Sequence, residues 1–355
     1  MSAKRKIYIF GSNREGQLGI SFGDDCALSP VEVGHVEGNT VSRVSLNQHQ
    51  TFIVQDNGVI LTAGANDNNE LGRSGKRSLL HRVDALETFQ VREGSIGTGF
   101  FNLLTDDGRL VSWGVNDLGQ LGNNTRDNKD KPRVNTTIQE PILLIASGAT
   151  HSIGLTKSGR VITWGGNRWG QLGDGQLTSS TKIHVPLQLR HRPVISVACG
   201  ENHSLVMTVG GNVYGWGENT QGQLGLSDTT NRLRPEQIKA LRSMGATKIA
   251  AGRNHSLVIS QSGLLLAFGS NNHGQCGVDS EVKIQPQPIV VERLRELRAV
   301  DVSGGFAHTL VLCEVPGSAT SRVYVMGLNS SGQVSSSFLS FIPHNLIPFY
   351  FHFTS

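Results

Sequence analysis

The sequence predicts an all-β fold: a seven-bladed β-propeller built from four-stranded antiparallel blades, the last of them incomplete. Two observations predict it. A motif of the form G-x-N-x-x-G-Q-L-G recurs along the whole chain, and six of its seven copies follow a block of short apolar runs separated by glycine-containing turns. The period of roughly 52 residues accommodates four strands of about five residues with their turns, which is one propeller blade.

The first element of the repeat is the glycine that opens each motif. It follows an aromatic or apolar strand end, where a positive φ or a close backbone approach requires glycine. The recurrent Asn suits a turn, because its side chain bonds its own backbone. We expect the Leu of Q-L-G in the core and the Gln to satisfy backbone groups near a blade junction. The motifs begin at Gly11, Gly64, Gly114, Gly165, Gly217, Gly269 and Gly327.

The second element is the block before each motif, clearest in PVISVACGENHSLVMTVGGNVYGWG at residues 193–217. It holds three runs of four to six residues rich in Val, Ile, Leu and Trp, which predict strands. A linear β-solenoid is the alternative, but its repeats are usually shorter and its open ends need caps. The one helix-like segment, Val291 to Arg298, is predicted to form one or two turns within a loop.

The repeats define the expected domain boundaries. A propeller is predicted over residues 1–334, with repeats starting near residues 7, 59, 109, 160, 212, 264 and 322. Residues 335–355 are predicted to be a non-repeat apolar tail, either disordered or a truncated end. Seven motifs but six histidine-type blocks are present, so we expect the last blade to lack strands unless residues 349–353 replace one.

Composition limits the classes of function. The net charge is +4 and the charges are scattered, whereas nucleic-acid binding calls for a clustered basic face. No two cysteines lie at C-x-x-C spacing, which argues against a zinc or redox motif. No apolar leader and no run of 18 apolar residues occurs. We therefore expect a cytoplasmic or nuclear protein with no cofactor, no metal and no transmembrane segment.

The pairing of G-x-N-x-x-G-Q-L-G with A-x-G-x-x-H-S-x-x-L resembles the repeats of the regulator of chromosome condensation family, from Ile7 to about Gln333. The resemblance implies a seven-bladed propeller. The founding member is a nucleotide exchange factor for the GTPase Ran, and relatives include secretion-regulating exchange-factor-like proteins, a plant ultraviolet photoreceptor and modules of ubiquitin ligases. We expect a protein-interaction propeller that regulates a small GTPase or a trafficking complex. The alternative is an active exchange factor for a Ran-like GTPase.

Chemistry on a small molecule is not expected. Four histidines occupy the same place in successive repeats, and such repetition favours a structural role such as a hydrogen bond to backbone. The aligned positions of the first two repeats hold Gln50 and Phe100, so no ring of ligands is complete. No Lys-Ser or Lys-Thr follows the glycine motif, so it is not a phosphate-binding loop. The histidines are His151, His203, His255 and His308.

The residues just before these histidines are the predicted partner-binding site. They vary between repeats, and variable loops on a rigid scaffold are where binding residues concentrate. The family resemblance implies acidic residues here in the exchange factor, but only Glu201 is acidic. Arg168 and Trp169, in a motif loop, form the second candidate site, and the other three tryptophans end strands, which argues against the photoreceptor. The first site comprises Thr150, Glu201, Asn202, Arg253, Asn254 and Phe306.

Overall fold

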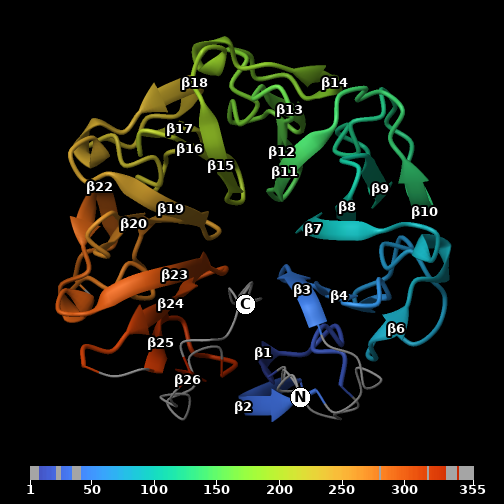
Figure 1. Cartoon of the computed structure of the whole chain (residues 1–355), viewed down its shortest axis with the longest axis horizontal. Coiled ribbons are helices and arrows are strands. Elements are labelled where there is room, and N and C mark those ends of the chain that lie inside the picture. Colours follow the sequence, from blue (N-terminus) through green and yellow to red (C-terminus); the bar gives the residue numbers. More distant parts are fainter. Residues whose placement is uncertain are drawn as a thin grey trace.

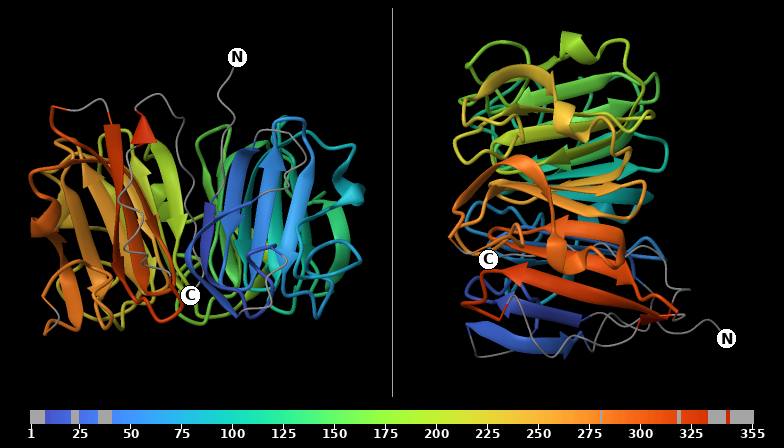
Figure 2. Two further views of the ribbon diagram at one scale, coloured as in Figure 1. Left: turned by 90° about the horizontal axis from the view of Figure 1, so that it is seen from below. Right: turned by 90° about the vertical axis from the view of Figure 1, so that its left-hand side faces the viewer.

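The computed structural model describes residues 8–20, 25–33, 41–279, 281–317, 320–332 and 342–343. Within these residues the chain forms a ring of antiparallel sheets around a central opening (Figure 1). Side views show the sheets standing side by side around the ring (Figure 2). No helix in the described part of the chain is long and apolar enough to cross a membrane.

The prediction of seven four-stranded blades was wrong. The described residues form six four-stranded sheets and one two-stranded sheet, β1 (Tyr8–Ser12) with β2 (Cys26–Glu32). Each four-stranded sheet takes its three innermost strands from one histidine-type block, and the chain has six such blocks. The two-stranded sheet flanks the first motif, which no such block precedes. Counting motifs therefore overestimated the number of complete blades.

The last repeat does not form the incomplete sheet that was expected. Its sheet runs β23, β24, β25 and β26, and the two-stranded sheet comes from the start of the chain instead. Of the predicted tail, only Ile342–Pro343 is described, as β26. The predicted repeat start near residue 7 and the predicted substitute strand at residues 349–353 lie outside the described residues.

The strands of the six blades follow chain order, from the innermost to the outermost strand. The first blade contains β3 (Val41–Leu46), β4 (Gln50–Gln55), β5 (Ile60–Gly64) and β6 (His81–Arg82). The second contains β7 (Val91–Gly97), β8 (Phe100–Thr105), β9 (Leu110–Gly114) and β10 (Lys129–Val134). The third contains β11 (Ile142–Ser147), β12 (His151–Thr156), β13 (Val161–Gly165) and β14 (Ser180–His184).

The remaining three blades repeat this order. The fourth contains β15 (Val194–Cys199), β16 (His203–Thr208), β17 (Val213–Gly217) and β18 (Arg232–Gln237). The fifth contains β19 (Ala246–Ala251), β20 (His255–Ser260), β21 (Leu265–Ser270) and β22 (Ile284–Val290). The sixth contains β23 (Arg298–Gly304), β24 (His308–Glu314), β25 (Thr320–Gly327) and β26.

Short 3-10 turns connect successive blades. The predicted helix-like segment holds one, η4 (Glu292–Leu294), before β23 begins. Equivalent turns that the sequence did not reveal precede three other blades: η1 (Asp84–Leu86), η2 (Leu187–Leu189) and η3 (Lys239–Leu241). Each buries one leucine, which ties the connection to the core.

The core lies between blades. In the second strand of most blades every residue is buried, because one face of the strand packs on the preceding blade and the other on the next. Phe52 of the first blade meets Phe101 of the second edge to face, and Phe101 stacks on Trp113 with ring centroids 4.8 Å apart. A blade therefore gains its buried surface only from its neighbours in the ring.

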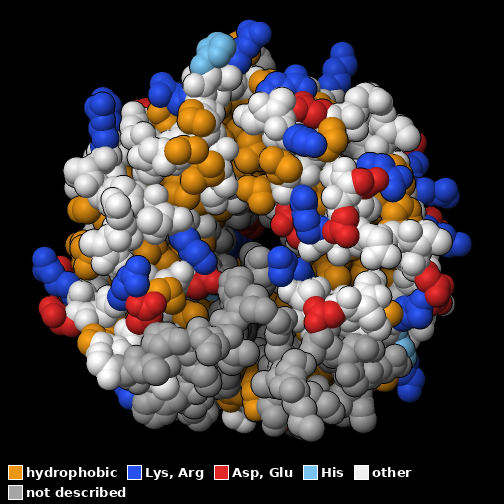
Figure 3. Space-filling model, viewed as in Figure 1, with side chains coloured by type: hydrophobic (Ala, Val, Ile, Leu, Met, Phe, Trp, Pro, Cys, Tyr) orange, Lys and Arg blue, Asp and Glu red, His pale blue; other side chains and the backbone are white. Residues whose placement is uncertain are grey.

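The ring has two faces. His151 pairs with Gly165, so the turn at 148–150 and the motif loop that follows lie at the same end of the blade; we call this the motif face. Leu155 pairs with Val161 at the opposite end, which we call the hairpin face. Viewed along the ring axis, acidic and basic side chains are interspersed around the central opening (Figure 3).

Candidate functional site

Backbone hydrogen bonds join the turns that surround the opening on the motif face. The N–H of Ala149 donates to the carbonyl of Glu201, and the N–H of Glu201 donates to the carbonyl of Arg253, both at 3.0 Å. The N–H of Arg253 donates in turn to Gly305, also at 3.0 Å. The turns of successive blades are thus fixed to one another. They surround a cavity of about 160 Å³ that continues into the central channel.

The repeat histidines bridge blades instead of lining this opening. His151 Nε2 lies 3.0 Å from Ser204 Oγ in the next blade, and Ser204 Oγ donates to the carbonyl of Gln171 at 2.9 Å. Because the serine proton is used there, Nε2 carries the histidine proton. His203 and Ser256 repeat the arrangement one blade further on, at 2.9 Å. Burial lowers the pKa of His151 and that of His203 to about 3, so both rings are neutral at pH 7.

Each of these histidines requires the glycine three residues before it. A Cβ added to Gly148 would lie 2.6 Å from His151 Nδ1 and 2.5 Å from the carbonyl oxygen of Gly200. In the first blade, where Gln50 replaces histidine, Asn47 replaces the glycine. Asn47 Nδ2 donates to Gln50 Oε1 at 2.8 Å and to the carbonyl of the next blade's glycine, Gly97, at 2.6 Å. In the second blade, where Phe100 replaces histidine, Gly97 is retained, because a Cβ there would overlap the Phe100 ring. A ring at the histidine position therefore requires the glycine for steric reasons.

The motif glycines are required by both conformation and space. Gly165 has a φ of +101°, and a Cβ there would lie 2.5 Å from the carbonyl oxygen of Thr150. Gly217 has a φ of +97°, and its Cβ would lie 2.5 Å from the carbonyl oxygen of Asn202. Gly114 and Gly269 adopt the same conformation. These glycines let the motif loop lie directly against the turn that borders the opening.

The structure separates the six predicted partner-binding residues into two sets. Glu201, Arg253 and Phe306, each two residues before a histidine, line the opening. Two of the residues that directly precede the histidines contact the motif loops instead. Asn202 Nδ2 donates to Glu218 Oε2 at 3.0 Å, and Thr150 lies against Gly166. The Oδ1 atom of Asn254 is buried and has no partner within the described residues.

Glu201, Arg253 and Phe306 form one connected group. Arg253 Nε lies 2.5 Å from Glu201 Oε2, and the Arg253 guanidinium carbon lies 4.3 Å from the centre of the Phe306 ring. Three consecutive blades supply these side chains. The equivalent residues in the first three blades are uncharged: Gln48, Thr98 and Ala149. The opening therefore has one charged side and one neutral side.

Arg168 and Trp169 lie apart from this group. Both belong to the motif loop of the third blade, and neither lines the cavity at the opening. The Arg168 guanidinium carbon lies 5.6 Å from the Trp169 ring centre, and the backbone N–H of Trp169 donates to Gln171 Oε1 at 2.9 Å. Trp169 is partly buried and Arg168 is exposed.

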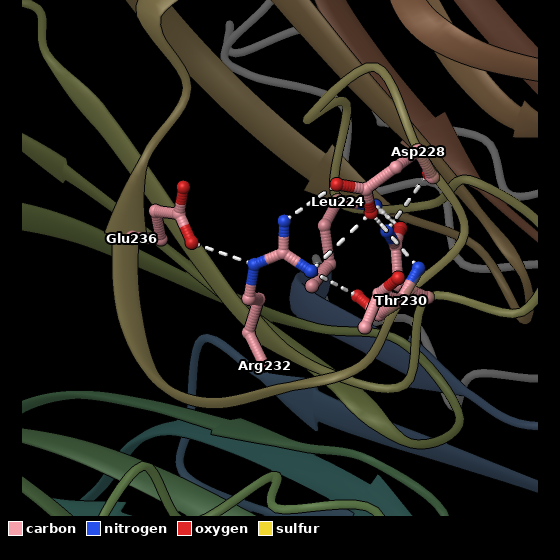
Figure 4. A network of polar contacts seen from close by, with 6 residues as sticks. Leu224, Asp228, Thr230, Arg232 and Glu236 are labelled. Carbon is pink, nitrogen blue, oxygen red and sulfur yellow. Dashed lines mark hydrogen bonds and ion pairs between the residues drawn. The ribbon is translucent and has the colours of Figure 1, made fainter.

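The sequence did not reveal a polar network that holds the motif loop of the fourth blade. Arg232 donates from Nε to Glu236 at 2.6 Å, from Nη2 to Asp228 at 2.7 Å and from Nη1 to the carbonyl of Thr230 at 2.6 Å (Figure 4). Asn219 donates to the same Asp228 carboxylate at 3.1 Å. This loop carries Glu218, the partner of Asn202, so the network supports the border of the opening.

The described residues contain no group of three or more His, Cys, Asp or Glu side chains placed to hold a metal ion. Burial raises the pKa of Cys276 and that of Cys313 to about 12. The arrangement on the motif face offers a rigid, charged surface for contact with another molecule.

Comparison with known proteins gives a consistent assignment. A family model described as RCC1-like domain matches residues 6–341. The E3 ubiquitin-protein ligase HERC2 of Mus musculus is 32% identical over 339 residues, which cover 93% of this chain and 7% of HERC2. The ultraviolet-B receptor UVR8 of Arabidopsis thaliana is 27% identical, covering 92% of this chain and 73% of UVR8.

A solved structure shares the fold. Prp20p of Saccharomyces cerevisiae superimposes with a TM-score of 0.79 at 20% identity, covering 97% of this chain and 86% of that chain. Prp20p is described as having binding properties toward Gsp1p and histones. At this level of identity the likeness shows the fold alone.

Proposed function

Because this chain belongs to the RCC1-like domain family, we propose that it is a protein-interaction propeller that binds a partner at the motif face and regulates a small GTPase or a trafficking complex. The chain spans only 7% of the length of HERC2, so the ligase activity in that relative's name is not carried over to it. The proposed role needs no cofactor and no chemistry on a small molecule.

The observation that carries the proposal is the group formed by Glu201, Arg253 and Phe306. Side chains that are charged or aromatic, partly exposed and held by backbone hydrogen bonds are well suited to serve as binding anchors. The turns that carry them are tied to neighbouring blades, so little conformational freedom is lost on binding. The buried, neutral histidines support a role in joining blades and offer no accessible catalytic base.

Nucleotide exchange on a Ran-like GTPase is the second candidate. Prp20p, which shares the fold, is described as binding Gsp1p, and this motivates the candidate. The family resemblance implies an acidic face, however, and the acidic residue of this opening is paired. Arg253 lies 2.5 Å from Glu201 and neutralises its charge. That pairing favours partner binding over exchange driven by an acidic face.

The double variant Glu201→Ala/Arg253→Ala tests the proposal. We expect it to lose proteins that the wild-type chain captures from cells, which mass spectrometry identifies. Its matched control is Lys248→Ala/Asp301→Ala, which removes another ion pair between blades, with Nζ and Oδ1 2.7 Å apart, from the wall of the central channel. Equal capture by both variants, with both folded, would place the partner site elsewhere.

Two assays then separate the two candidate functions. Calorimetry measures binding of the purified partner, and release of labelled GDP from a Ran-like GTPase measures nucleotide exchange. Partner binding without stimulated GDP release supports the interaction role. Stimulated release that depends on Glu201 would favour exchange. We also propose a location in the cytoplasm, the nucleus or both, which imaging of the tagged full chain tests. We propose no nucleic-acid partner, since charges of both signs are interspersed on the face that Figure 3 shows.

A further inference from the structure

We propose that Arg253 is a carboxylate-binding residue: the outer edge of its guanidinium receives an aspartate or glutamate side chain of the protein partner. This inference rests on the proposed function, because it names the chemistry by which the same opening recognises that partner. Three features of the structure carry it: the fixed orientation of the guanidinium, its unused donors, and the space in front of it.

Two contacts fix the orientation of the guanidinium. Glu201 Oε2 accepts from Arg253 Nε at 2.5 Å, which sets the direction of the side chain within the plane of the opening. The guanidinium carbon lies over the Phe306 ring, 4.3 Å from the ring centre, and this contact restrains the guanidinium on that side. The side chain of Arg253 remains 40% exposed, so it is held without being buried.

The same arrangement leaves the Nη donors of the guanidinium unused. Among the residues that the structure describes, the Nη1 and Nη2 atoms of Arg253 have no hydrogen-bond or ion-pair partner. A guanidinium whose Nε is occupied can still bind a carboxylate end-on. Nη1 then donates to one carboxylate oxygen and Nη2 donates to the other. The pairing with Glu201 therefore orients Arg253 without blocking this edge.

Backbone hydrogen bonds hold the turns that carry these three side chains in fixed positions relative to one another. Glu201 and Arg253 are joined by the hydrogen bond between the Glu201 N–H and the Arg253 carbonyl, and the Arg253 N–H reaches Gly305, next to Phe306. All three side chains thus project from turns bonded to one another. A partner meets an arginine already in position, which reduces the entropy lost on binding.

The space and charge of the opening select the ligand. Thr98 and Ala149, on the neutral side, are small and border the cavity of about 160 Å³. Glu201 and Arg253 together carry no net charge, so a singly charged carboxylate adds one negative charge beside Glu201. A phosphate group carries up to two negative charges, so it meets both more repulsion from Glu201 and more attraction to Arg253. We assign the site to a carboxylate, and the phosphoserine peptide below tests that assignment.

The test selects peptides from a random-sequence display library for binding to the full chain. An excess of the Thr98→Trp variant is present in solution as a competitor. Thr98 is exposed at the opening, and tryptophan there fills the cavity without altering the charged group. Peptides that bind elsewhere are removed by this competitor. We expect the retained peptides to be enriched in Asp or Glu at one position.

Each retained peptide is then synthesised with the acid, with the corresponding amide and with phosphoserine at that position. For the wild-type chain we expect the acid-to-amide change to weaken binding about ten- to hundredfold. For Arg253→Gln we expect the same change to have less than about a twofold effect, and for Arg253→Lys an intermediate one, because lysine keeps the charge but not the two-pronged geometry.

The outcomes distinguish failure of the proposed function from failure of the role of Arg253. If no peptide survives competition with Thr98→Trp, the opening is not a protein-binding surface and both proposals fail. If peptides survive but show no acidic preference, or lose equal affinity on amide substitution with wild type and Arg253→Gln, only the role of Arg253 is wrong. Tighter binding of the phosphoserine peptide than of the acid would overturn the assignment to carboxylates.

Discussion

The packing of glycine against histidine predicts that Gly148→Ala destabilises the ring strongly. The added Cβ would lie 2.6 Å from His151 Nδ1 and 2.5 Å from the carbonyl oxygen of Gly200, whereas ordinary contacts begin near 3.4 Å. Something must move by about 0.8 Å. Moving the His151 ring disturbs its 3.0 Å bond to Ser204, and moving the Gly200 turn disturbs the neighbouring backbone bond between Ala149 and Glu201.

The expected loss combines overpacking, about 1–3 kcal/mol, with one weakened hydrogen bond, about 1 kcal/mol. We therefore expect Gly148→Ala to lower the free energy of unfolding by about 2–4 kcal/mol, measured by urea titration followed by tryptophan fluorescence. Gly210→Ala is the control, since its Cβ would meet only the end of the Asn212 side chain, at 3.3 Å. If the two variants differ by less than about 0.5 kcal/mol, the steric account of the glycine is refuted.

Three further predictions concern titration and contacts between blades. Burial lowers the pKa of His203 to about 3, so below pH 6.5 the unfolded state binds a proton that the folded state does not. The free energy of unfolding should therefore fall by about 1.4 kcal/mol per pH unit for each such histidine as the pH is lowered. Urea titrations at pH 7 and pH 5 should show a smaller fall for His203→Phe than for the wild-type chain. Trp216→Phe removes the 2.8 Å bond from Nε1 to the Gln171 carbonyl and should cost about 1 kcal/mol in the same assay; no loss would show that the bond contributes nothing. Arg232→Gln releases Asp228 and should speed amide hydrogen exchange in residues 226–231, while unchanged exchange would mean that the loop is held by other contacts.

Periodicity alone determined the architecture of this protein. The roughly 52-residue period, the Gly-rich turns and the apolar runs of strand length predicted antiparallel blades in a ring, because these are local properties of each repeat. Asn219 behaves as the turn argument requires: its Oδ1 accepts from the Leu224 N–H at 2.9 Å. The same local logic failed for the number of blades, because a blade needs a motif and a histidine-type block, and the first motif has no such block before it.

Only the tertiary structure decided how repeats interact. The repeat histidine was expected to bond backbone, yet His151 reaches a hydroxyl in the next blade, 53 residues along the chain, and Ser204 passes the contact back to Gln171. Glu201 stood out in the sequence as an isolated acid, yet Arg253 neutralises it. These partners are one repeat apart, and no local pattern links them. They meet because closing the ring brings equivalent turns of neighbouring blades into hydrogen-bond contact.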